Sequence, residues 1–412
     1  MERGTKRRER TEEVDVKRRL ETVAVHGGEE RCDAYDALTM PIVMSSTYTF
    51  PDTRAVREFV KRKAAGDRLE RYEYGRYGNP TQTAAERALA ALDGGDRALL
   101  FSSGMAAITT TLLTLLSAGD HLVLVGGVYR RTREFARAHL PRFGIEVTES
   151  SEEALADAIR PATRVVLFEV PTNPYLRVAD VEAIARLARQ RGLVTVVDAT
   201  FATPVNLQPL DLGVDIVLHS ATKYVGGHND LLAGAVIGSA ERLAPIEEAR
   251  GVFGAVAGPF DAYLVLRGVK TLPLRVRAQN GSAGRLAGFL ETHPAVARVH
   301  YPGLSSHPDH AVASRVMSGF GGVVSFELAG GLDAASTVID RLSIPAVGPT
   351  FGGAESVVQQ QALFISPDPV ERAASGIADG LIRYAVGLES IDDLIDDLCV
   401  ALRGLPEGRG SE

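Results

Sequence analysis

LVTVV, at residues 193–197, is a continuous run of aliphatic and β-branched residues, and the acid Asp198 follows it directly. Comparable apolar runs occur at residues 121–125 (HLVLV), 164–168 (RVVLF), 216–218 and 233–237. A strand that is apolar along its whole length is buried on both faces, which is typical of parallel sheets covered by helices. Ligands of such sheets bind at the carboxyl ends of the strands. We therefore expect chemically active side chains just after these runs.

Helical patterns alternate with the predicted strands. Residues 83–92 (TAAERALAAL), 105–116 and 180–190 favour helices because they are rich in good helix formers or amphipathic. After about residue 272, glycine pairs punctuate shorter elements, with a strand within 320–328 and a helix at 334–341. The alternation predicts the α/β class, with a smaller α/β domain after residue 272.

Composition excludes several function classes. Hydrophobic residues make up 45% and charged residues 24% of the 412 residues, which is typical of a soluble globular protein. A net charge of −7 argues against nucleic acid as the main partner. The two cysteines, Cys32 and Cys399, provide neither a disulfide framework nor metal-ligand spacing, so we expect a cytoplasmic protein without a metal. No apolar run approaches the ~20 residues of a membrane span.

The first 19 residues mix basic and acidic side chains. A secretory signal needs an apolar stretch, and a mitochondrial presequence avoids acids. We therefore expect a solvated or disordered arm at the start of the chain.

Three segments lie where the sheet predicts chemistry: VVDAT at residues 196–200, HSATKYVGGH at 219–228, and SSGM at 102–105. Taken singly, the acid could cap a helix and the lysine could be a solvent-exposed charge. Taken together, they match the needs of pyridoxal phosphate. This cofactor requires a lysine that holds it covalently, a carboxylate that keeps its ring nitrogen protonated, and donors for its phosphate.

Each part of this set has a physical reason. The Lys223 amine becomes a nucleophile when burial or a neighbouring cation lowers its pKa. The hydroxyl groups of Ser220 and Thr222 can donate to phosphate oxygens. The backbone N–H groups of Gly104 and Met105 open a predicted helix, which favours an anion, and glycine allows close approach.

From about residue 41 to residue 398, the sequence resembles the Cys/Met-metabolism family of pyridoxal-phosphate enzymes, which includes cystathionine γ-synthase, cystathionine γ-lyase and methionine γ-lyase. The matching motifs are YGRYGNPT (74–81), PTNP (171–174), Asp198 with TFATP (200–204), SATKY (220–224) with GGH (226–228), PFDAYL (259–264) with LRG (266–268), KTLPLR (270–275), YPGL (301–304) and VGLE (386–389).

The resemblance implies a fold type I pyridoxal-phosphate-dependent transferase. Its large domain would hold a mostly parallel seven-stranded sheet, and a smaller α/β domain would follow. We accordingly divide the chain into an N-terminal arm (1–75) whose later part contacts a neighbouring subunit, a large domain (76–272) and a C-terminal domain (273–412). Tyr74 and Arg76 resemble residues that reach the phosphate in the neighbouring subunit. This implies a homodimer with shared active sites, usually paired into a tetramer.

The resemblance also implies roles at the cofactor. Lys223 would hold the cofactor and move protons, and Asp198 would pair with the ring nitrogen. Tyr129 would stack on the cofactor and assist proton transfer. Phosphate binding would fall to Gly104, Met105, Ser220 and Thr222. For Tyr129, the alternative is a packed tyrosine at a strand end.

On the substrate side, Asn173 would lie near a cofactor oxygen and the substrate carboxylate. Arg383 resembles the arginine that holds the α-carboxylate, a task that suits its planar fork. The alternative for Arg383 is a charge on a surface helix.

Departures from the family pattern concentrate on the substrate side. Arg130 and Arg131 replace two glycines after the stacking tyrosine, and they either bind an extra anionic group of the substrate or point to solvent. Thr350, a candidate substrate contact, and Phe351 replace a serine–leucine pair. The other departures are Val170, Ala199, Ala385 and the segment QQQALF (359–364), which stands where the family has Met-Thr-His. The cysteine of methionine γ-lyases is absent near Tyr129.

These observations predict an enzyme that eliminates or replaces a substituent at the β or γ carbon of an amino acid, with sulfur amino acid chemistry of the cystathionine γ-synthase or γ-lyase type. One alternative is a specialised biosynthetic γ-substitution that uses a vinylglycine-type intermediate and a non-standard anionic substrate. A different class is an inactive cofactor-binding subunit with a structural or regulatory role. The motif set argues against an aminotransferase or decarboxylase.

Overall fold

The computed structural model describes residues 18–28, 36–66 and 71–406. The disorder expected for the first residues falls on 1–17, outside the described ranges, and Cys32 lies outside them as well. Among the helices of the described residues, none is long and apolar enough to cross a bilayer.

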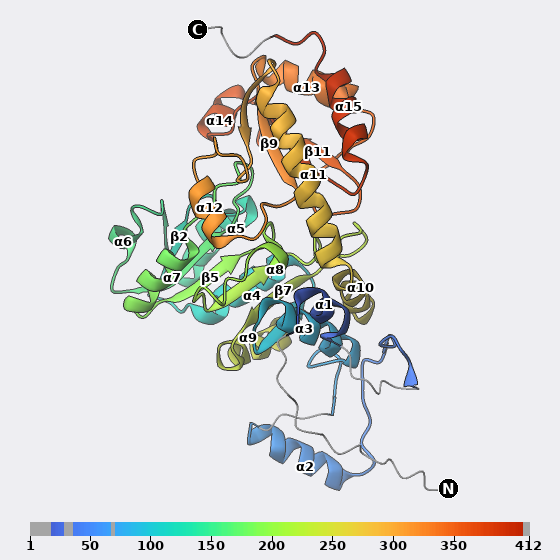
Figure 1. Cartoon of the computed structure of the whole chain (residues 1–412). Coiled ribbons are helices and arrows are strands. Elements are labelled where there is room, and N and C mark those ends of the chain that lie inside the picture. The colour runs from blue at the N-terminus through green and yellow to red at the C-terminus, as the bar shows by residue number, and fades with distance from the viewer. Residues whose placement is uncertain (1–17, 29–35, 67–70, 407–412) are drawn as a thin grey trace.

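The larger of two sheets has seven strands in the order β1-β7-β6-β5-β4-β2-β3 (Figure 1). Its strands are β1 (Arg97–Phe101), β2 (His121–Val125), β3 (Glu146–Ser150), β4 (Thr163–Glu169), β5 (Val194–Asp198), β6 (Ile216–His219) and β7 (Gly234–Gly238). The pairs from β6 to β3 are parallel, whereas β7 runs antiparallel to both β1 and β6. The predicted α/β class with a mostly parallel sheet is confirmed.

Helices cover both faces of this sheet and bury two apolar cores. One core packs α3 (Pro80–Asp93), α7 (Val181–Gln190) and α10 (Pro259–Val269) against one face. The opposite core packs α4 (Gly104–Leu115), α5 (Arg130–Ala138) and α9 (Ala240–Phe253). Short helices α6 (Leu155–Ala158) and α8 (Thr203–Asn206) complete this part. Because helices bury both faces of the sheet, its polar side chains lie mainly at the ends of the strands.

A second sheet of five strands lies beside the first, in the order β10-β11-β12-β9-β8. It comprises β8 (Val296–His300), β9 (Val323–Leu328), β10 (Ala346–Val347), β11 (Val357–Gln360) and β12 (Leu381–Ala385). A separate apolar core joins it to α11 (Leu272–Thr292), α13 (Gly331–Arg341) and α15 (Ile391–Ala401). Two further helices, α12 (His310–Val316) and α14 (Pro369–Ala374), flank it in Figure 1.

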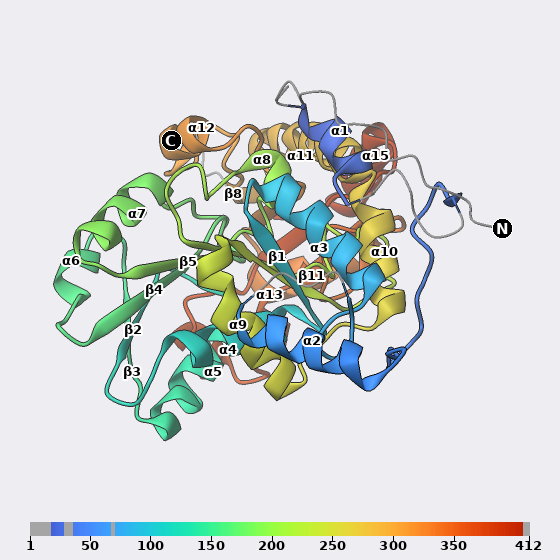
Figure 2. The ribbon, with the colours of Figure 1, turned by 90° about the horizontal axis from the view of Figure 1, so that it is seen from below.

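The N-terminal segments differ in their packing. Helix α1 (Leu20–His26) packs on α3, and its Ala24 is buried. Helix α2 (Thr53–Ala64) stands away from the sheets at the lower end of Figure 1 and crosses in front of them in Figure 2.

All five apolar runs form strands, and the predicted helices are present with ends shifted by a few residues. The strand expected within 320–328 is β9. The apolar run 233–237 is an exception in direction, because its pattern predicts a parallel strand and β7 is antiparallel. The segment from Ser220 to Ala233 contains no helix, so the chain turns back without the crossover that a parallel neighbour requires.

Arg275, on α11, ties the chain after Lys223 to the rest of the fold. Its buried guanidinium donates to the carbonyl oxygens of Tyr224 (2.8 Å) and Gly268 (2.9 Å), and to Oγ1 of Thr271 (3.0 Å). The residues that carry the lysine are therefore fixed by a side chain of the helix that leads to the second sheet.

We predict that Arg275→Ala lowers the free energy of unfolding by about 3 kcal/mol, because buried carbonyl groups lose charge-assisted hydrogen bonds. Arg285, on the same helix, is exposed and pairs with Asp392. Arg285→Ala should cost about 0.5 kcal/mol or less. Urea unfolding followed by circular dichroism measures both changes. Equal losses would show that the Arg275 bonds do not hold this region.

Candidate active site

Five predicted site residues converge at one edge of the large sheet. Gly104 follows β1, Tyr129 follows β2, Asn173 follows β4, Asp198 ends β5 and Lys223 follows β6. These strands are mutually parallel, so their carboxyl ends meet at the same edge. The fold therefore brings residues that are up to 119 positions apart in the sequence to the same edge of the sheet.

The Lys223 amine lies in a partly buried position between the two sheets. Its Nζ donates to Oγ1 of Thr350 at 2.9 Å and lies 5.2 Å from the centroid of the Phe351 ring. Burial, helped by the charge of Arg383, lowers the pKa of Lys223 to about 8. The amine can therefore lose its proton near neutral pH and act as a nucleophile or a base.

Asp198 is partly buried, and a local hydrogen-bond pair holds it. Its Oδ1 accepts from the backbone N–H of Thr200 (3.0 Å) and from the Thr200 hydroxyl (2.5 Å). The same Thr200 oxygen accepts from the backbone N–H of Ser220 at 2.8 Å, which links the acid to the segment that carries Lys223. Burial raises the pKa of Asp198, while the Thr200 bonds and the nearby His219 oppose that rise.

His219 belongs to a buried pair behind Asp198. Its Nε2 lies 3.0 Å from Oδ1 of Asp93, at the end of α3, and both side chains are almost fully buried. Burial alone lowers the pKa of His219, but the Asp93 carboxylate more than offsets this and the net shift is upward. A positive charge on His219 therefore favours the ionised form of Asp198.

The start of α4 provides donors for an anion. Ser103 caps the helix, with its Oγ accepting from the N–H of Ala106 at 3.0 Å, so the first amides of the helix lack partners within it. A Cβ at Gly104 would lie 2.9 Å from Cβ of Ser220, so only glycine permits this close approach. The amides of Gly104 and Met105 and the hydroxyl of Ser220 are thus adjacent.

Thr222, the fourth predicted phosphate contact, has other partners in this structure. Its hydroxyl accepts from the N–H of Ala233 (3.0 Å) and donates to the carbonyl of the same residue (3.2 Å). These bonds tie together the two ends of the segment between β6 and β7. Its phosphate contact remains a prediction.

Arg383 lies on β12 and is 3% exposed. The alternative of a surface helix charge is therefore wrong. The guanidinium donates to Oδ1 of Asn173 (3.2 Å) and to the carbonyl of Thr350 (3.1 Å), and it lies 5.4 Å from the Phe351 ring centroid. Burial lowers its pKa to about 10, so it remains cationic at neutral pH. Its Nε has no hydrogen-bond partner among the residues that the structure describes.

Tyr129 precedes α5 and is 41% exposed, which excludes the alternative of a packed tyrosine. Arg130 and Arg131 are exposed as well, and Arg131 pairs with Glu134 at 2.6 Å. Arg130 lines a cavity of about 450 Å³ together with Arg133 and Arg137, opposite α14.

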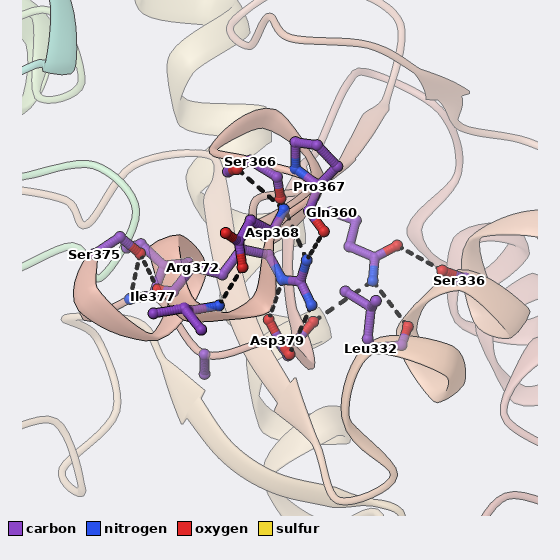
Figure 3. Close-up of polar contacts among 12 residues, drawn as sticks. Leu332, Ser336, Gln360, Ser366, Pro367, Asp368, Arg372, Ser375, Ile377 and Asp379 are labelled. Carbon is purple, nitrogen blue, oxygen red and sulfur yellow. Dashed lines mark hydrogen bonds and ion pairs between the residues drawn. The ribbon is translucent and has the colours of Figure 1, made fainter.

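Gln360, from the segment 359–364 that replaces the family's Met-Thr-His motif, and Arg372 take part in a set of polar contacts around α14 (Figure 3). Arg372 of α14 donates to the Pro367 carbonyl and to the Asp379 carboxylate, both at 2.8 Å. The Gln360 amide donates to the Leu332 carbonyl at 2.8 Å and accepts from the Ser336 hydroxyl at 2.9 Å. These bonds fix α14 as one wall of the cavity beside α5.

Tyr74 and Arg76 make contacts apart from this cluster. Tyr74 forms an isolated bridge with Thr47, and Arg76 donates to the carbonyl of Gly251 (2.5 Å) and lies over the Tyr77 ring. Within one chain, therefore, they bind the N-terminal segment and α9 rather than the residues around Lys223.

Several residues around the site escape the sequence argument. Phe351 was noted only as a departure, yet its ring faces both Lys223 and Arg383 and stacks on Phe201 at 4.0 Å. Glu169 ends β4 opposite Asp198. It could have been found from the sequence, because it follows the apolar run 164–168 just as Asp198 follows the run 193–197.

The arrangement fits pyridoxal phosphate. The tight contact at Gly104 leaves backbone amides of α4 open to a phosphate, and the carboxylate of Asp198 suits a protonated ring nitrogen. The unpaired Nε of buried Arg383 suits an amino acid carboxylate. Among the described residues, there is no group of three or more His, Cys, Asp or Glu that could hold a metal ion.

Comparisons with known proteins identify relatives of this chain. The chain is 43% identical over 392 residues to cystathionine γ-synthase 1 of Arabidopsis thaliana, covering 93% of this chain and 69% of the relative. It is 42% identical to an L-methionine γ-lyase of Fusobacterium nucleatum, covering 92% and 96%. The solved structure of cystathionine γ-lyase from Lactobacillus plantarum, complexed with L-serine, matches with a TM-score of 0.86 and 36% identity over 94% and 99% of the two chains.

A family profile, described as that of the Cys/Met metabolism PLP-dependent enzymes, matches residues 21–403, which include both sheets and every residue of the cluster around Lys223. Pyridoxal phosphate requires a reactive amine, an acid for its ring nitrogen and donors for its phosphate. The site offers the buried Lys223 amine, Asp198 at a strand end and the backbone amides at the start of α4. This chain belongs to the family of Cys/Met metabolism enzymes that depend on pyridoxal phosphate.

Proposed function

We propose that the protein eliminates or replaces a substituent at the γ carbon, or eliminates one at the β carbon, of an amino acid of sulfur amino acid metabolism, in the manner of a cystathionine γ-synthase or γ-lyase. The observation that carries this proposal is that Lys223 and Arg383 both hydrogen-bond to Thr350, while the Nε of Arg383 has no partner among the described residues. The amine would hold the cofactor to which a substrate α-amino group is joined, and the free cationic donor suits the α-carboxylate of the same substrate.

When bound, pyridoxal phosphate supplies a ring that withdraws electrons from the substrate α carbon. Arg383 and Asn173 hold the carboxylate and so orient the α carbon. Lys223, with its lowered pKa, takes a proton from the α carbon and can return it elsewhere. Asp198 keeps the proton on the ring nitrogen. Acid–base steps of this kind contribute roughly 10²–10⁴-fold each.

Tyr129 is available to the same centre. Its exposed ring follows β2 at the edge where Asp198 ends β5, and we place it over the cofactor face. Its phenol would then assist departure of the substituent. Gly104, Met105, Ser220 and Thr222 would hold the phosphate, which the adjacency of the α4 amides and Ser220 supports.

A second candidate substrate class has an observation in its favour. Arg130, Arg133 and Arg137 line one side of the cavity between α5 and α14, directly after Tyr129. A distal phosphate or carboxylate on the substituent would be attracted to this side. This supports a γ-substitution on an anionic substrate, with Arg130 as a specificity residue. Arg131 is not part of this lining and pairs with Glu134, so its role as a second specificity residue stays a prediction.

We further propose a homo-oligomer, a dimer of dimers with shared active sites. Leu38, Met44 and Tyr77 expose large apolar side chains on the N-terminal segments, which is typical of a surface that meets another chain. Tyr74 and Arg76 of one subunit would then reach the phosphate site of its neighbour. We place the protein in the cytoplasm, which its two cysteines favour. An inactive cofactor-binding subunit remains the alternative of another class.

Product analysis tests the reaction type. The purified protein with pyridoxal phosphate is incubated with cystathionine and with activated homoserine esters, with and without an added thiol. We expect a keto acid and ammonia without the thiol, or a thioether with it, since both outcomes follow from the same acid–base set. Turnover of none of these, nor of other β- or γ-substituted amino acids, would favour the inactive subunit.

A double substitution tests the anionic substrate. We predict that Arg130→Gly with Arg131→Gly lowers kcat/KM for a phosphate or dicarboxylate substrate about tenfold, because a charge-assisted contact is lost. A neutral acetyl ester of the same amino acid should change by less than about twofold. Arg142→Gly, a change to another arginine before β3, serves as the control. Equal effects on the two substrates would exclude this role.

A further inference from the structure

Glu169 is a buried acid without an assigned role. It is the last residue of β4, pairs in register with Asp198 of β5 and is 3% exposed. Its Oε2 has no hydrogen-bond partner among the described residues. A buried polar atom without a partner is rare and usually marks a functional constraint.

Glu169 and Asp198 lie in register on neighbouring strands, whose backbones are about 4.8 Å apart. In a buried site the charge of one carboxylate disfavours the charge of the other, and Asp198 raises the pKa of Glu169. Such a pair favours one neutral and one ionised member.

The surroundings decide which member stays neutral. Asp198 accepts two hydrogen bonds from Thr200 and lies near His219, and both features favour its ionised form. Burial, followed by the charge of Asp198, raises the pKa of Glu169 well above its usual value, although Arg133 of α5 opposes this. A proton shared by the pair is therefore favoured on Glu169 over Asp198.

The carboxyl group of Glu169 lies between two sides of the candidate site. Its strand β4 pairs with β2, which leads to Tyr129, and Asn173 follows β4 itself and bonds to Arg383. The backbone N–H groups of Tyr129 and Asn173 favour the ionised carboxylate, which places both of them near it. One side chain thus lies near the residue proposed to stack on the cofactor and the residue proposed to align the substrate.

We propose that Glu169 is a positioning residue that acts as a neutral carboxylic acid. It fixes the Tyr129 and Asn173 segments and leaves Asp198 as the single negative charge at this edge of the sheet. The positioning part rests on the proposed roles of Tyr129 and Asn173, whereas the neutral state does not.

The neutral state is tested on the cofactor-free protein by infrared difference spectroscopy. Wild type minus Glu169→Gln should show a carbonyl stretch of a protonated carboxylic acid at pH 7. Glu327→Gln is the control, because Glu327 pairs with His300 and its bond to that ring lowers its pKa, so this difference should show a carboxylate. A carboxylate signal in the Glu169 difference would overturn the neutral state.

Positioning is tested by titrating the cofactor-free proteins with pyridoxal phosphate. Glu169→Gln keeps an acceptor for both N–H groups, so its Kd should stay within about threefold of wild type. Glu169→Ala leaves them unpaired, and its Kd should rise about tenfold or more. Glu169→Gln should also keep the pH profile of the wild-type cofactor absorbance. An unchanged Kd for Glu169→Ala, or equal losses for both variants, would overturn the positioning role.

The two measurements separate this inference from the proposed function. If wild type bound no pyridoxal phosphate, the proposed function and the positioning role would both fail. The infrared result would still decide whether Glu169 is neutral. If wild type bound the cofactor and the infrared signal was a carboxylate, the inference alone would fail.

Discussion

Burial of the Lys223 amine helps the chemistry of the site, whereas burial of the Asp198 carboxylate works against it. The rest of the site depends on keeping Asp198 ionised although it is buried. Removal of water favours the neutral form of both groups. For Lys223 this shift is useful, because a neutral amine is the reactive form, and its pKa falls to about 8. For Asp198 the same shift would remove the charge that a ring nitrogen needs. The structure opposes it locally, through Thr200 and through the buried His219–Asp93 pair.

Both sheets supply residues to the site. The large sheet presents Asp198 and the α4 amides at its strand ends, and Thr200 joins Asp198 to the segment of Lys223. The second sheet brings Arg383 and Thr350 over that edge, and Arg383 contributes to the low pKa of Lys223. Arg275 holds the residues after the lysine from the helix that joins the sheets. Charged residues from both parts of the chain therefore set the pKa values of the groups that would meet substrate and cofactor.

The sequence predicts the features that arise within short stretches of the chain, namely the buried strands and the polar residues at their ends. Continuous apolar runs place the strands β2, β4, β5, β6 and β7, and strand-end chemistry identifies Asp198 and Lys223, because both signals are local. The direction of β7 depends on the path of the chain between Ser220 and Ala233, which periodicity does not report. The family resemblance marks Arg383 as a substrate contact, but no local pattern predicts its burial, which arises because β12 lies between β11 and β9. Glu169 could have been found from its place after the apolar run 164–168, but its pairing with Asp198, like that of His219 with Asp93, comes from neighbours on other elements.

The most direct test of the account is to fix pyridoxal phosphate to the protein with borohydride and to map the modified residue by mass spectrometry over a range of pH. We predict one adduct, on Lys223. The rate of condensation should rise as pH passes through about 8, because the neutral amine is the reactive form and its pKa is lowered to that value. An adduct on other lysines with none on Lys223, or no adduct at any pH, would contradict it.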